Sequence, residues 1–181
     1  MKIPGAITIA VITAVTASAA PQRVAVCSEI GNGFAIARAQ SIAAAVYSKI
    51  GVRIDWHRPA SCPAGAIHID YSYQTPSDFM PKALARAWPY EGIHIVLFCD
   101  RIQKQHRPEQ FSTVLGHVMA HEIAHILEGV CRHSESGIMK ANWTVDDYSA
   151  MAFHPLAFAD QDVVMIHKGM EARESRMAAL R

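Results

Sequence analysis

Two histidines flank a glutamate in the segment HEIAH, which runs from His121 to His125. Residues four apart lie on one face of a helix, so both imidazoles can reach one metal ion at about 2.0–2.1 Å. Glu122 lies about 100° further round the helix. It can therefore stand beside the ion without binding it, where a carboxylate can hold and deprotonate a metal-bound water. This residue order predicts a catalytic metal site, and we expect the metal to be Zn²⁺.

A catalytic zinc normally takes three protein ligands, and three downstream residues could supply the third. His133 follows Gly129, where the chain can turn back towards the ion, and we expect it to be that ligand. Cys131 is a competitor because a thiolate binds zinc well, unless a disulfide engages it. Glu128 stands on the helix itself and is expected to face solvent near the helix end. The predicted ligands are therefore the two histidines of HEIAH together with His133.

A further histidine, His117, stands one helical turn before His121 and extends the same stripe. Helical drift carries it about 40° away from His121. Val118, and not a glutamate, follows it. We expect His117 to support the site from behind or to be partly exposed near the helix start, and not to bind the metal.

The residues around HEIAH are apolar, so the segment is predicted to form a buried helix over residues 112–127. Ser112 and Thr113 are acceptable caps at its start, and Gly129 is expected to end it. Two histidines and a glutamate buried in such a helix would be costly without partners. A bound metal accounts for them.

The rest of the chain supplies the elements that must position this helix. A helix is predicted over 34–50, with Asn32 as a possible cap and Gly51 as its stop, and a last helical region from about residue 156. Strands are predicted over 23–27, 52–56, 66–73 and 94–100, the last being the best candidate for a central strand because it is almost continuously apolar. This order indicates an α+β domain in which a small mixed sheet packs on the helix that carries HEIAH.

The N-terminal residues have the layout of a secretory signal peptide. Lys2 precedes an apolar run over 6–15 and a small-residue stretch over 16–22, with cleavage expected after Ala19 or Ala20. The run is shorter than the ~20 residues that a membrane span needs. We therefore expect residues 1–20 to be removed, leaving a single domain over 21–181 that is secreted or periplasmic and has no membrane span.

Charge and cysteine content narrow the function classes further. Lysine and arginine total 17 against 16 acidic residues, so no net field favours a nucleic-acid partner. An even number of cysteines in an oxidising compartment predicts two disulfides, with three possible pairings, and buried free thiols are the alternative. The four cysteines are Cys27, Cys62, Cys99 and Cys131.

HEIAH, the glycine turn, His133 and the sequence SGIM that ends at Met139 together resemble the metzincin branch of the zincin metallopeptidases. The longer stretch from Gly116 to Trp143 resembles short secreted bacterial proteins regarded as zinc peptidases. The resemblance implies a zincin-like domain with a peptide or protein substrate. It implies that the three histidines bind zinc, that Glu122 is the general base, and that Met139 forms a methionine turn beneath the metal.

The chain departs from the metzincin pattern H-E-x-x-H-x-x-G-x-x-H at two positions. The glycine position of the pattern falls on Glu128 and its last histidine on Cys131, so the glycine and the histidine of this chain come one and two residues late. Metzincins also place a tyrosine two residues after the turn methionine, where this chain has Ala141. Tyr148 is the nearest substitute for stabilising an oxyanion.

These observations favour a secreted zinc metalloendopeptidase. The main alternative is a zinc-binding or catalytically silent zincin-like protein that recognises peptides without cutting them, although the intact Glu122 argues against it. A disulfide-stabilised interaction protein without metal would leave the spacing of HEIAH unexplained.

Overall fold

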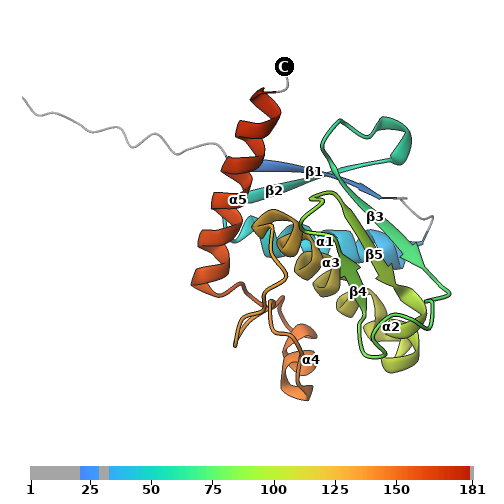
Figure 1. Cartoon of the computed structure of the whole chain (residues 1–181). Helices are drawn as coiled ribbons and strands as arrows, with labels where there is room; N and C mark the ends of the chain where they lie inside the picture. Colours follow the sequence, from blue (N-terminus) through green and yellow to red (C-terminus); the bar gives the residue numbers. More distant parts are fainter. Residues whose placement is uncertain (1–20, 29–32, 180–181) are drawn as a thin grey trace, which may run out of the picture.

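The computed structural model describes residues 21–28 and 33–179. The predicted signal peptide and the possible cap Asn32 lie outside the described residues. The main elements are β1 (Gln22–Ser28), α1 (Phe34–Ser48), β2 (Val52–His57), β3 (Ile67–Ser72), β4 (Ala85–Ala87), β5 (His94–Phe98), α2 (Cys99–Gln105), α3 (Phe111–Glu128), α4 (Val145–Met151) and α5 (Asp160–Ala179) (Figure 1). Among these residues, no helix has the length and apolar character needed to cross a membrane.

The strands form one mixed sheet in the order β2-β1-β3-β5-β4. Strands β2, β1, β3 and β5 are parallel to one another, and β4 pairs antiparallel with β5. The sheet is therefore mixed, as expected, and α1 supplies the crossover between β1 and β2 that parallel pairing requires. The strand predicted to be central, β5, is flanked by β3 and by the short edge strand β4, which was not predicted.

Helix α3 lies in the middle of the domain, packed against α1 and the sheet (Figure 1). It is apolar on nearly all sides, and all but three of its 18 residues are buried. Gly116 lets α1 approach closely, since a Cβ there would lie 2.7 Å from the Ala39 carbonyl oxygen. The Tyr47 hydroxyl of α1 donates a hydrogen bond to the Ala120 carbonyl at 2.9 Å. These contacts fix the position of α3 directly before HEIAH.

The C-terminal end of α3 is set by Gly129 and by α5. Gly129 adopts a left-handed conformation at φ 71°, which glycine reaches without steric cost, and its N–H bonds the His125 carbonyl at 3.0 Å. Helix α5 crosses α3 so closely at Gly169 that a Cβ there would lie 1.6 Å from the Leu127 carbonyl oxygen. The loop after Gly129 therefore leaves α3 at a defined place and direction.

Several predicted boundaries differ from the structure. Helix α3 begins at Phe111, directly after a 3-10 turn over Pro108–Gln110, so the expected serine or threonine cap is not used. The last predicted helical region corresponds to α5, which begins at Asp160 and not near residue 156. Helix α4 lies before that region and was not predicted. It is capped by Thr144, whose hydroxyl accepts from the Asp147 N–H at 3.3 Å.

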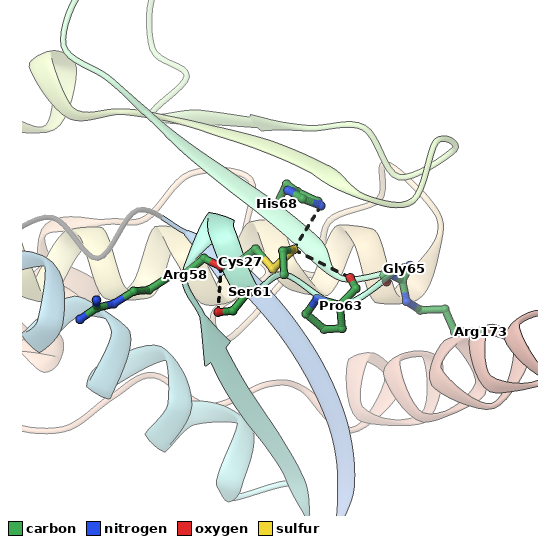
Figure 2. The surroundings of a disulfide bond; sticks show 8 residues. Cys27, Arg58, Ser61, Pro63, Gly65, His68 and Arg173 are labelled. Atoms are coloured by element: carbon green, nitrogen blue, oxygen red, sulfur yellow. Dashed lines mark hydrogen bonds between the residues drawn. A yellow bond between two sulfur atoms is a disulfide. The ribbon is translucent and has the colours of Figure 1, made fainter.

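The prediction of two disulfides is wrong for one pair. Cys27 and Cys62 form a disulfide that joins the end of β1 to the segment before β3 (Figure 2). The other two cysteines are free, because Cys99 is sealed in the core and Cys131 is exposed on the loop after α3. Figure 2 also shows Arg173 of α5 reaching this region, where its guanidinium donates to the Gly65 carbonyl at 2.5 Å.

Candidate metal centre

The three predicted ligands come together in the structure. His121 and His125 project from α3 one turn apart, and His133 approaches them from the loop that follows Gly129. One ring nitrogen of each histidine lies within 4.8 Å of the others. The Nε2 atoms of His121 and His125 are 3.0 Å apart, and the His133 ring centroid lies 5.3 Å and 5.0 Å from their ring centroids. These three imidazoles could hold one metal ion.

Hydrogen bonds on the far side of two rings fix which nitrogen carries the proton. The Nδ1 atom of His121 lies 2.8 Å from the Ile138 carbonyl oxygen, and that of His125 lies 3.1 Å from the Val130 carbonyl oxygen. A carbonyl oxygen can only accept, so each Nδ1 is the protonated nitrogen and donates. In the neutral rings, each Nε2 therefore presents a lone pair.

Two lone pairs 3.0 Å apart cannot hydrogen-bond to each other, and one metal ion bound by both nitrogens would satisfy them together. Two imidazole nitrogens on a tetrahedral zinc at ~2.0–2.1 Å lie about 3.3 Å from each other. The observed spacing matches this value closely. The donor set of three imidazole nitrogens is also one that zinc favours, so the residues present fit zinc.

Burial lowers the pKa values of all three histidines and keeps their imidazole rings neutral. Burial, together with the neighbouring His125, lowers the pKa of His121 to about 3. Burial and the nearby His133 lower the pKa of His125 to about 4. The pKa of His133 is lowered by burial and by Arg132. The three rings are therefore neutral near pH 7, and neutral imidazole is the form that binds a metal.

Glu122 is buried beside this group and does not belong to it. Burial raises the pKa of its carboxyl to about 8, although a hydrogen bond with the backbone of Ala87 opposes the shift. Ala87 ends the edge strand β4, so the carboxyl contacts the sheet edge, and it lines the same cleft as the histidines. A divalent cation nearby would favour the carboxylate and lower this pKa. Glu122 is thus placed where a proton acceptor next to a metal would be needed.

The segment that ends in Met139 forms a tight turn against α3. Gly137 has φ 73°, and a Cβ on it would lie 2.4 Å from the Ala157 carbonyl oxygen, so only glycine fits there. The Ile138 N–H donates to that carbonyl at 2.8 Å. The Ile138 carbonyl accepts from the indole N–H of Trp143 at 3.1 Å as well as from the His121 ring. The buried methionine turn therefore orients one of the predicted ligands.

His117 lies outside the three-histidine group, and of the two alternatives expected for it, partial exposure is wrong. Its side chain is buried, and its Nδ1 bonds the Thr113 carbonyl at 2.7 Å. Its Nε2 accepts from the Leu156 N–H at 3.1 Å. With both nitrogens engaged, His117 tethers the segment that follows α4 to α3.

Glu128 and Cys131, the other two candidates for the third ligand, also lie outside the group. The expectation that Glu128 faces solvent is wrong, because its side chain is fully buried next to Arg132, with the Nε atom 3.4 Å away. The pKa of Glu128 is raised to about 7, chiefly by burial. The nearby Arg132 opposes this shift, and Asp162 adds to it. Cys131 is exposed, and its thiol is not among the atoms that meet within 4.8 Å.

The three histidines and Glu122 open into a cleft of about 1110 Å³. One side is formed by residues 82–91, which include the edge strand β4, and the other by residues 140–143 of the loop after the methionine turn. Tyr148 of α4 also lines the cleft, and its ring lies 4.6 Å from that of His106. Burial raises the pKa of the Tyr148 hydroxyl, so it stays a protonated donor at neutral pH.

Two parts of this site gave no usable sequence signal. The three residues of β4 are too few to show an alternating pattern. That they line the cleft follows only from the position of the strand at the sheet edge. The bond from Trp143 to the methionine turn depends on a loop conformation that no spacing rule predicts. The sequence shows only that Trp143 lies four residues after Met139, which does not predict this bond.

Comparison with known proteins yields a structural likeness only. No protein-family model matches the sequence, and no curated protein matches it. The fold is similar to the crystal structure of archaemetzincin from Methanopyrus kandleri, with a TM-score of 0.54 and 9% sequence identity, over 87% of this chain and 99% of that chain. At that identity the likeness concerns the fold alone. The chain therefore has an archaemetzincin-like fold, and a histidine group that could bind zinc lines the cleft described above.

Proposed function

We propose that the protein is a secreted zinc metalloendopeptidase in which His121, His125 and His133 bind the metal. The observation that carries the proposal is the pair of buried Nε2 lone pairs, 3.0 Å apart, that face a third imidazole in an open cleft. Glu122 stands next to them and is the proposed general base. The likeness to a protein named as a metzincin supports the same reading, since the fold and the motif point to one class.

When bound, zinc would polarise the scissile carbonyl and make a water molecule more acidic. Glu122 takes the proton from the attacking water and then returns it to the leaving amine, which is general base followed by general acid catalysis. The carbonyl groups of Ile138 and Val130 hold the two α3 imidazoles in the orientation that aims Nε2 at the cleft. Tyr148, protonated at neutral pH and exposed to the cleft, is the proposed donor to the oxyanion.

The position of β4 favours an extended peptide as the substrate. This strand pairs on one side with β5 and lies at the edge of the sheet, beside the cleft. An unpaired strand edge can accept a further strand through main-chain hydrogen bonds, whatever the side chains. A peptide added there would pass the histidines, because Ala87 at the end of β4 contacts Glu122.

The test is hydrolysis of an unfolded protein substrate by the purified mature chain, with and without a chelator. Turnover that is lost on chelation and restored by zinc supports the proposal, provided that Glu122→Gln keeps its zinc and loses turnover. Zinc binding without turnover by the wild type would instead favour the silent, peptide-recognising alternative. Turnover that survives in Glu122→Gln would refute the assignment of the base.

A further inference from the structure

Charged residues that do not line the cleft form a cluster that includes Arg132, which is next to His133 in the sequence. The cluster joins the loop that carries His133 to the start of α5. We define the Arg132 cluster as Arg132 and Ser134 of that loop together with Asp162 of α5. Asp162 is fully buried, and Arg132 is about one quarter exposed. Burying charges is costly unless they are well paired, so this arrangement calls for a reason beyond solubility.

Contacts within the cluster link the loop to the helix at several points. The Arg132 guanidinium forms an ion pair with Asp162 through Nη2. The Ser134 hydroxyl donates to Asp162 at 2.5 Å and accepts from Arg132 Nη1 at 3.1 Å. The second Asp162 oxygen accepts from the Ala159 N–H at 3.1 Å, which fixes the start of α5. The guanidinium is therefore held on a rigid element.

The same guanidinium reaches the backbone of the third predicted ligand. Arg132 Nη1 donates to the His133 carbonyl at 3.5 Å. The two residues that flank His133 in the sequence, Arg132 and Ser134, are both bonded to Asp162. The rings of His121 and His125 are oriented by bonds to carbonyl groups. Among the described residues, no hydrogen bond to the His133 ring is found, so its orientation depends on its backbone.

The sequence explains why such a support is needed. In the metzincin spacing the last histidine would fall on Cys131, and here it comes two residues later. Two extra residues lengthen the loop and increase the number of conformations in which His133 misses the ion. A loop fixed from behind recovers a defined ligand position.

We propose that Arg132 and Asp162 are positioning residues that preorganise His133 and thereby set the zinc affinity of the site. The inference rests on the proposed zinc site and adds that tight zinc binding also requires two residues that are not ligands. Because the pair acts through the backbone of His133, its loss weakens metal binding while all three imidazoles remain present.

The test measures the zinc dissociation constant by competition with a chromophoric chelator, together with the thermal midpoint of the zinc-free protein. The variants are Asp162→Asn, Arg132→Met and the double substitution. The matched control is Arg173→Met, which removes another half-buried arginine that bonds α5 to a loop, through the carbonyls of Gly65 and Gly92. It lies on the same helix and has no contact with the predicted ligands.

We expect each single variant to bind zinc about 10- to 100-fold more weakly, in the range found when groups that orient metal ligands are removed. The double variant should lose little more than either single variant, because the two side chains act as one unit. Arg173→Met should lower the thermal midpoint and leave the zinc affinity unchanged. Equal weakening in Arg173→Met, or unchanged affinity in a folded Asp162→Asn, would overturn the inference.

A milder variant guards against loss of folding. Ser134→Ala removes one hydrogen bond to Asp162 and leaves the ion pair, so it should weaken zinc binding by a smaller factor. Unchanged affinity would count against the inference.

Turnover by the wild type is measured separately, so that failure of the peptidase proposal can be told apart from failure of this inference. Zinc-binding wild type without turnover would refute the peptidase proposal and leave this inference standing, whereas a wild type that binds no zinc refutes both.

Discussion

Replacing Glu122 by glutamine should abolish turnover and at the same time stabilise the zinc-free protein. The carboxyl is buried and its pKa is raised from 4.5 to about 8. Glutamine has nearly the same shape, can still accept the hydrogen bond from Ala87, and cannot ionise. The substitution therefore removes the proton acceptor and also the energetic cost of burying an ionisable group.

The size of the stabilisation follows from proton linkage. A raised carboxyl pKa means that the folded state holds a proton that the unfolded state has released, so stability falls as pH rises from about 4.5 to about 8. At about 1.4 kcal/mol per pH unit, the wild type loses roughly 3 kcal/mol by pH 7 relative to pH 4.5. The variant has no such loss. Its advantage in unfolding free energy should be small near pH 4.5 and reach roughly 3 kcal/mol at pH 7.

The assay is urea unfolding in the presence of a chelator at pH 5, 6, 7 and 8, with peptide hydrolysis measured on the zinc-loaded proteins. Glu109→Gln, at an exposed glutamate that does not line the cleft, controls for the substitution itself and should show neither effect. We expect Glu122→Gln to lose about 10²- to 10⁴-fold in turnover. A variant that is no more stable than the wild type at pH 7, or one whose turnover falls by much less than about 10²-fold, would refute the reasoning.

Three further predictions concern the support of the site. In the Glu122→Gln background, the zinc-free protein should lose about 3 kcal/mol of unfolding free energy between pH 6.5 and 5. The reason is that the two α3 histidines have lowered pKa values and must stay neutral in the folded state, and urea unfolding at a series of acidic pH values would detect the loss. Gly169→Ala should destabilise the fold by about 3 kcal/mol or more, since its Cβ would overlap the Leu127 carbonyl, and a thermal midpoint equal to that of the wild type would contradict the close crossing of α5 and α3. Reduction of Cys27–Cys62 should lower the unfolding free energy by about 2–4 kcal/mol, measured with and without a thiol reductant, while zinc affinity stays unchanged.

The sequence was most informative where the chemistry depends on one local period. The i, i+4 spacing of His121 and His125 and the glycine after the helix required only a helix to be meaningful, and α3 has the expected course. The four longer strands were also foreseen, because apolar alternation marks them. His133 could be predicted because zinc needs a third ligand and a glycine turn precedes it.

The errors arose where long-range packing decides the outcome. Glu128 was expected in solvent, but α5 crosses the end of α3 at Gly169 and covers it. Two disulfides were expected with their pairing left open, yet Cys99 lies in the core and Cys131 on an exposed loop, and both are free. The edge strand β4 is too short to show a pattern, and it becomes recognisable only through its pairing with β5.

The central claim is tested most directly by the metal content of the purified mature protein, measured by elemental analysis beside His133→Ala and Cys131→Ser. We predict one zinc per chain in the wild type and in Cys131→Ser, and a sharp loss in His133→Ala. Loss in Cys131→Ser alone would transfer the third ligand to the cysteine and contradict the three-histidine site. No metal in any of the three would contradict the account as a whole, and would leave HEIAH as a chance pattern in a buried helix.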